Sequence, residues 1–234
     1  TIEPFTVYFG ETEQEALDKD NAYLFQTFTK EDIGKTSKAF GFRYVFIPDG
    51  QNGQPHVEVY YEYLPEARNP KAKFTCSDEM LNKIWQIAGH TFELNSREFY
   101  LDGIKRDRWV WSGDSYQCYF TDRYYAFEKE TAKRTIIAFA GKEKITQHIN
   151  TINDYTFYWI ISVYDYYVAT GDKDFVKQML PRMQEYLDFC ISRLDEDGLV
   201  VARENDWIYI DWAELDKTGP LCAEQMLLMR SIEV

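Results

Sequence analysis

Residues 102–114, called here the motif segment, hold a dense mixture of side chains that can do chemistry. Three carboxylates, at Asp102, Asp107 and Asp114, are interspersed with three cations and two tryptophans. A charge run alone is usually a solvated face, but tryptophans are costly to expose and binding sites often lie on such mixed loops. Carboxylates held among aromatic rings and guanidinium groups suit acid-catalysed cleavage of a sugar linkage. We therefore expect the catalytic residues of the chain to lie in the motif segment.

The composition narrows the classes of partner. The 234 residues include 39 acidic and 26 basic side chains, and the formal net charge of -13 opposes binding to nucleic acid or to an anionic membrane surface. Aromatic residues make up 17% of the sequence and suit neutral sugars, whose apolar faces stack on aromatic planes. The four cysteines and three histidines lack the spacing of a zinc site, so we expect no metal or cofactor. Cysteine pairing stays open.

The first seventy residues show the alternation that is typical of β-strands. Apolar or aromatic side chains recur at every second position over residues 40–47 and 56–63, and the turn-rich stretch 48–53 separates them. So few strands cannot form a complete sandwich. They form either a small sheet or the end of a larger β domain, and we favour the second.

The pattern changes to a helical period after Cys76. Ser77 is expected to cap a helix that has Leu81, Trp85, Ala88 and Phe92 on one face. This change predicts two parts, with residues 1–72 as the end of a β domain and its linker, and residues 73–234 as a helical domain.

Later segments predict further helices. Residues 155–169 are strongly apolar, Gly171 is a typical helix stop, and Asp172 can cap the following helix. Pro181 should kink or break that helix. A last helical pattern runs from about residue 220 to residue 229, so the sequence predicts a mainly α fold made of helical hairpins.

Four stretches of the sequence resemble the α-L-rhamnosidases of glycoside hydrolase family 78. They are residues 42–45, residues 76–85, the Asp-Gly-x-Lys-Arg-Asp-Arg run of the motif segment, and residues 167–174. The motif segment is the most specific of them. The resemblance implies part of an (α/α)6 six-hairpin toroid, preceded by a few antiparallel strands from a β-sandwich domain.

The resemblance also implies roles for single residues. Asp102 would hold sugar hydroxyls, Asp107 would be the general acid, and Asp114 would contact the substrate or the region of the catalytic water. Arg106 and Trp111 would line the sugar pocket. Many family members have Glu at the general acid position, so the shorter Asp107 is a departure that leaves its competence as an acid open.

An Asp-Trp pair borders the sugar in family members. Two pairs of this sequence, Asp206-Trp207 and Asp211-Trp212, are candidates for it. The residues do not decide between them, and we take Asp211 and Trp212 as the candidate substrate-binding pair.

The activity that the resemblance implies is removal of terminal, non-reducing α-L-rhamnose from glycosides or polysaccharides by an inverting mechanism. The helical part is too short for a full toroid, so we expect the general base, a later glutamate in the family, to lie outside this chain. The chain alone should then be inactive and should associate with the remainder of the catalytic domain or with itself.

Two other functions stay open: a non-catalytic carbohydrate-binding or scaffold protein of six-hairpin fold, and a six-hairpin glycosidase of other sugar specificity. The amino terminus has no signal-peptide pattern. The family suggests a periplasmic or extracellular location.

Overall fold

The computed structural model describes residues 3–48, 56–65 and 70–234, and the chain divides into two compact units. The N-terminal unit comprises Thr1–Glu62 together with Gly103–Arg108, and the helical unit comprises Tyr63–Asp102 and Trp109–Val234. The short segment Gly103–Arg108 is therefore grouped with Thr1–Glu62, although Tyr63–Asp102 of the helical unit separates the two in the sequence. The division at residues 72 and 73 stays a prediction.

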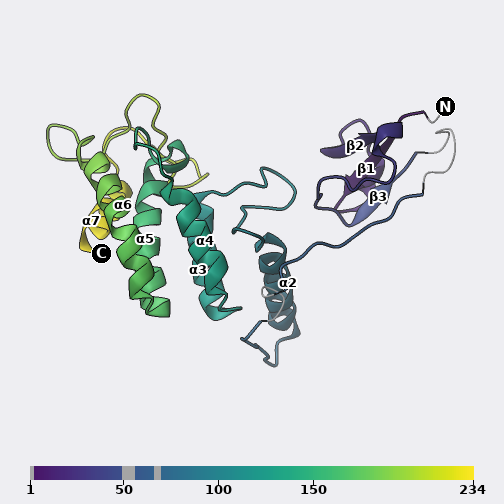
Figure 1. Cartoon of the computed structure of the whole chain (residues 1–234), viewed down its shortest axis with the longest axis horizontal. Helices are drawn as coiled ribbons and strands as arrows, with labels where there is room; N and C mark the ends of the chain where they lie inside the picture. The colour runs from purple at the N-terminus through teal and green to yellow at the C-terminus, as the bar shows by residue number, and fades with distance from the viewer. Residues whose placement is uncertain (1–2, 49–55, 66–69) are drawn as a thin grey trace. The chain divides into compact units, whose positions relative to one another are not determined.

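The N-terminal unit is built on a three-stranded antiparallel sheet of order β2-β1-β3 (Figure 1). Its inward side chains include Val7 and Phe9, and the ring of Phe9 stacks on that of Phe40 with centroids 4.7 Å apart. The elements are β1 (Phe5–Gly10), α1 (Glu13–Leu17), β2 (Leu24–Phe28), the 3-10 helix η1 (Lys30–Asp32) and β3 (Tyr44–Phe46).

The predicted strands of this unit were partly wrong. Of residues 40–47 only Tyr44–Phe46 pair as a strand, and residues 56–63 form no strand although they alternate. Val59 and Tyr60 are 62% and 72% exposed. Alternation makes a strand only where the backbone reaches a neighbouring strand and one face is buried. Residues 49–53 of the predicted turn lie outside the described residues.

The helical unit confirms the mainly α prediction. Its long helix α5 contacts α3, α4, α6 and α7, and Figure 1 shows these helices grouped around it. Phe157, Trp159 and Val163 of α5 are fully or almost fully buried, so α5 supplies the centre of the core. The elements are α2 (Glu79–Asn95), α3 (Ser112–Tyr124), α4 (Lys129–Ala140), the 3-10 helix η2 (Ile149–Thr151), α5 (Asn153–Thr170), α6 (Lys173–Ile191) and α7 (Cys222–Glu233).

The predicted hairpin between α5 and α6 is confirmed in detail. Gly171 ends α5 with a left-handed φ of 71°, which a side chain at this position would strain. Asp172 caps α6, since its carboxylate accepts the backbone N–H of Phe175 at 3.0 Å. Both signals act within a few residues of the turn.

One local prediction in the helices was wrong, and a second was wrong in part. The cap of α2 is Asp78 rather than Ser77, because Asp78 Oδ1 accepts the backbone N–H of Met80 at 2.8 Å. Pro181 does not break α6, which runs through it. Phe175 and Met183 are buried on either side of the proline, and this packing holds the helix together.

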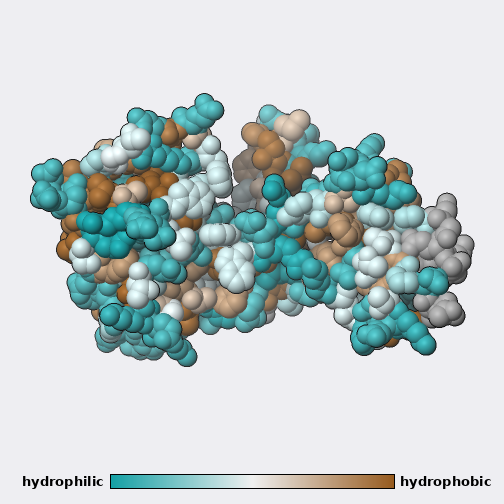
Figure 2. Space-filling model, turned by 90° about the horizontal axis from the view of Figure 1, so that it is seen from above, coloured by the Kyte–Doolittle hydropathy of each residue, from teal (hydrophilic) through white to brown (hydrophobic). Residues whose placement is uncertain are grey.

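The surface of the described residues is mixed. Figure 2 shows apolar side chains scattered among hydrophilic ones, and exposed apolar residues occur on several helices. Within the described ranges, no helix has the length and apolar character needed to cross a membrane. All four cysteines are free thiols.

Candidate active site

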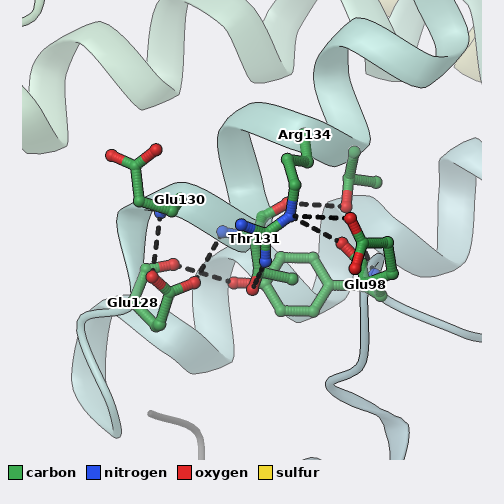
Figure 3. Close-up of polar contacts among 7 residues, drawn as sticks. Glu98, Glu128, Glu130, Thr131 and Arg134 are labelled. Atoms are coloured by element: carbon green, nitrogen blue, oxygen red, sulfur yellow. Dashed lines mark hydrogen bonds and ion pairs between the residues drawn. The ribbon is translucent and has the colours of Figure 1, made fainter. Parts of the chain in front are cut away.

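The chain that leads into the motif segment is fixed on α4 (Figure 3). Arg134 donates to the carbonyl oxygen of Glu98 and to Thr131 Oγ1, both at 2.9 Å. Glu128 caps α4 by accepting the backbone N–H of Thr131 at 2.5 Å. Tyr100, two residues before the motif segment, is 1% exposed, so the approach to Asp102 is held firmly in the helical unit.

Two hydrogen bonds join Asp102 and Trp109, the residues on either side of the segment Gly103–Arg108. The backbone N–H of Asp102 donates to the carbonyl oxygen of Trp109 at 3.2 Å, and the N–H of Trp109 donates to Asp102 Oδ1 at 2.9 Å. The residues between them, Gly103–Arg108, belong to the N-terminal unit. Of the predicted site residues, Arg106 and Asp107 therefore belong to one unit and the other five to the other unit.

Asn150 holds the start of α3 through two hydrogen bonds. Asn150 Oδ1 accepts the backbone N–H of Ser112 at 3.0 Å, and Asn150 Nδ2 donates to the carbonyl oxygen of Val110 at 3.2 Å. Ser112 Oγ donates to the carbonyl oxygen of Tyr155 at 2.8 Å. These bonds fix Trp111, the N-cap residue between Val110 and Ser112.

Tyr155 joins two predicted site residues. Its hydroxyl donates to Asp114 Oδ2 at 3.1 Å, and its ring meets that of Trp111 edge to face, with centroids 6.3 Å apart. Burial, and then the charge of Asp114, raise the pKa of Tyr155, so the phenol stays a donor to the carboxylate. Asp114 is thereby oriented in the first turn of α3.

A series of aromatic contacts connects Tyr155 with Trp212 of the candidate Asp-Trp pair. Tyr155 meets Tyr209 edge to face at 5.8 Å between centroids, and Tyr209 meets Trp212 at 5.2 Å. Trp207 contacts both Tyr209 and Trp212, at 5.7 Å each. We call Trp111, Tyr155, Trp207, Tyr209 and Trp212 the aromatic cluster.

The loop that carries Trp207 to Trp212 is pinned to the start of α5. Asp154 is fully buried, and its carboxylate accepts the backbone N–H groups of Tyr209 and Ile210 at 3.2 and 3.1 Å. The N–H of Asn153 donates to the carbonyl oxygen of Trp207 at 3.0 Å. Ile210 has a φ of 53°, an unusual value for a β-branched residue, at the point where Asp154 holds the backbone.

The two Asp-Trp pairs have different surroundings. Asp206 lies 2.5 Å from Arg193 Nη2, and its side chain is only 6% exposed. Trp212 is 78% exposed, and Asp211 next to it accepts the N–H of Ala213 at 2.7 Å. Trp212 is thus open to a ligand, while the carboxylate of Asp206 is engaged in a partly buried ion pair, and Asp211 and Trp212 stay the candidate pair.

The structure thus brings Trp111, Asp114 and Trp212 together through two tyrosines that sequence reasoning missed, Tyr155 and Tyr209. The aromatic richness around both was visible in the sequence, but it equally predicts core packing. Among the described residues, no cluster of three His, Cys, Asp or Glu side chains could hold a metal ion.

Alanine at Gly113 is expected to disturb this site from inside the helix. A Cβ there would lie 2.8 Å from Cζ of Tyr155 and closer still to Cε1, so the ring that orients Asp114 must shift. We expect a net loss of about 1–2 kcal/mol in the free energy of unfolding, because overpacking outweighs the gain in helix propensity. Urea unfolding measures it. Gly103→Ala is the control, since a Cβ there comes no closer than 3.9 Å to a neighbour; equal stability of the two variants would contradict the argument.

Comparison with known proteins agrees with this architecture. The family described as the bacterial alpha-L-rhamnosidase 6 hairpin glycosidase domain matches residues 69–226. A rhamnosidase from Klebsiella oxytoca with rhamnose bound superposes with a TM-score of 0.78 at 21% identity, over 98% of this chain and 51% of that one. A family 78 rhamnosidase from Bacillus sp. GL1 gives a TM-score of 0.75 at 21% identity, over 98% and 26%.

This chain thus spans about half of the first structure and about a quarter of the second. No curated protein matched. The two structures share the fold, and the family match extends over more than half of the sequence. The chain belongs to the bacterial α-L-rhamnosidase six-hairpin glycosidase domain family.

Proposed function

We propose that the native protein containing this chain removes terminal, non-reducing α-L-rhamnose from glycosides or polysaccharides. The observation that carries the proposal is the placement of Asp114 beside Tyr155 within the aromatic cluster, in a chain of the rhamnosidase domain family. A carboxylate with fixed orientation grips hydroxyls, while aromatic rings receive the apolar face of the sugar. The Klebsiella structure, which has rhamnose bound, supports rhamnose as the sugar.

We assign the proton-donating role to Asp107. Its side chain is exposed, so a substrate oxygen can approach it. Asp102, Arg106, Trp111, Asp114, Asp211 and Trp212 are assigned to substrate binding. Asp102 accepts one backbone N–H through Oδ1, and a carboxylate has further acceptor sites for a sugar hydroxyl.

An inverting mechanism needs a second carboxylate about 6.5–9.5 Å from the acid, which activates water on the opposite face of the ring. The family resemblance assigns this base to a glutamate of a later hairpin, and we propose that it comes from outside residues 1–234. The remainder of the catalytic domain, or a second copy of this chain, is the proposed partner.

The test is a hydrolysis assay on the native protein with aryl α-L-rhamnosides and a panel of other aryl glycosides, followed by proton NMR of the released sugar. We expect turnover of the rhamnoside with β-L-rhamnose as the first product. Release of the α anomer first would overturn the inverting mechanism. Turnover of another glycoside alone would change the proposed sugar specificity. Rhamnose binding without turnover would indicate a carbohydrate-binding protein instead of an enzyme.

A further inference from the structure

The segment that carries Asp107 is held within the N-terminal unit by contacts with residues 11–41. Lys105 forms an ion pair with Glu15 and a second one with Glu11 at 3.3 Å. The side chains of Lys105 and Glu15 are only 21% and 27% exposed. The hydrogen bond from Lys105 lowers the pKa of Glu15, so the pair stays charged.

Three more contacts fasten the same segment. Arg108 Nη1 donates to the carbonyl oxygen of Ala39, and the guanidinium of Arg106 lies over the ring of Tyr23, 5.3 Å from its centroid. Gly41 packs so tightly that a Cβ there would lie 2.8 Å from the carbonyl oxygen of Ile104. The contacts come from separate places in the N-terminal unit, so the segment is held at several points.

The backbone of the segment needs such support. Asp107 and Arg108 have φ angles of 40° and 53°, in the left-handed region that L-residues rarely adopt. Two consecutive residues in this region persist only where their surroundings hold them. The fastened residues Lys105, Arg106 and Arg108 stand immediately on both sides of Asp107.

We propose that the N-terminal unit is a clasp that sets the conformation of Gly103–Arg108, and that Glu15 is a positioning residue which acts on Asp107 through Lys105. The catalytic part of this proposal rests on the proposed function. The clasp itself does not, because it is read from the contacts within the N-terminal unit.

Limited trypsin digestion of the 234-residue chain tests the clasp, since Lys105, Arg106 and Arg108 are all trypsin sites. Glu15→Gln is expected to speed cleavage at these sites by about fivefold, the scale of one lost, partly exposed ion pair. Gly41→Ala should speed it through a different contact. Glu13→Gln, an exposed glutamate of the same helix, is the matched control. Unchanged cleavage in both Glu15→Gln and Gly41→Ala would overturn the clasp.

Kinetics on the native protein test the positioning role. Glu15→Gln should lower kcat for an α-L-rhamnoside by about tenfold with little change in KM, because a misplaced acid slows proton transfer more than binding. The loss should be larger for substrates with poorer leaving groups. If the segment loosens while kcat is unchanged, the positioning role is wrong. If the wild-type protein hydrolyses no rhamnoside, the proposed function fails and the positioning role with it, while the digestion still decides on the clasp.

Discussion

Asparagine at position 107 is expected to remove most of the hydrolysis of alkyl α-L-rhamnosides by the native protein that contains this chain. The N–H protons of an amide are too weakly acidic to be transferred to the leaving oxygen, and loss of a general acid typically costs roughly 10²–10⁴ in rate. An alkoxide is a poor leaving group, so its departure depends on this proton. The shape of the side chain is preserved, so the loss should appear in kcat with little change in KM.

The leaving group makes this prediction specific to proton donation. A nitrophenolate leaves without help, so Asp107→Asn should retain much more activity on a nitrophenyl α-L-rhamnoside than on an alkyl one. The measurement is kcat/KM over a series of leaving groups, with Asp174→Asn, whose side chain is 91% exposed on α6, as control. An equal loss on all substrates would show that Asp107 only binds or orients the sugar.

Local signals explain which parts of the fold could be predicted from the sequence. Gly171 acts through its own backbone, and Asp172 acts through its carboxylate on the N–H of Phe175, so the sequence predicts the turn between α5 and α6 correctly. The conformation of residues 56–63 and that of the helix around Pro181 depend on packing against residues that are distant in the sequence. Alternation over residues 56–63 carries no information on whether a neighbouring strand exists, and the burial of Met183 keeps α6 intact beyond its proline.

The candidate site likewise has a part that could be predicted from local sequence and a part that could not. The motif segment is contiguous, so its carboxylates and tryptophans could be recognised directly. Tyr155 reaches Asp114 across 41 positions and Lys105 reaches Glu15 across 90, and no local pattern encodes either contact. Assignment of Arg106 and Asp107 to the N-terminal unit follows only from such contacts.

Glutamine at position 224 is expected to remove a large pH dependence of stability. Glu224 of α7 is 0% exposed, and neither of its carboxylate oxygens has a hydrogen-bond partner among the described residues. Burial, and then the charge of Asp154, raise its pKa to about 8 from 4.5. The folded state therefore holds a proton that the unfolded state releases between these two pH values. This contribution to stability is fully present below pH 4.5 and is lost as the pH rises through about 8.

The neutral amide of Glu224→Gln titrates nowhere in this range, so the variant lacks this slope. The free energy of unfolding of the variant, relative to wild type, should increase by about 3 kcal/mol between pH 5 and pH 8. Asp154, whose pKa burial also raises, contributes to both proteins, so the difference between them isolates Glu224. Urea unfolding at several pH values measures it, with Glu233→Gln of the same helix as control. A difference that stays constant with pH would mean that Glu224 is ionised in the folded protein, and the buried carboxylate would then need a cation near it.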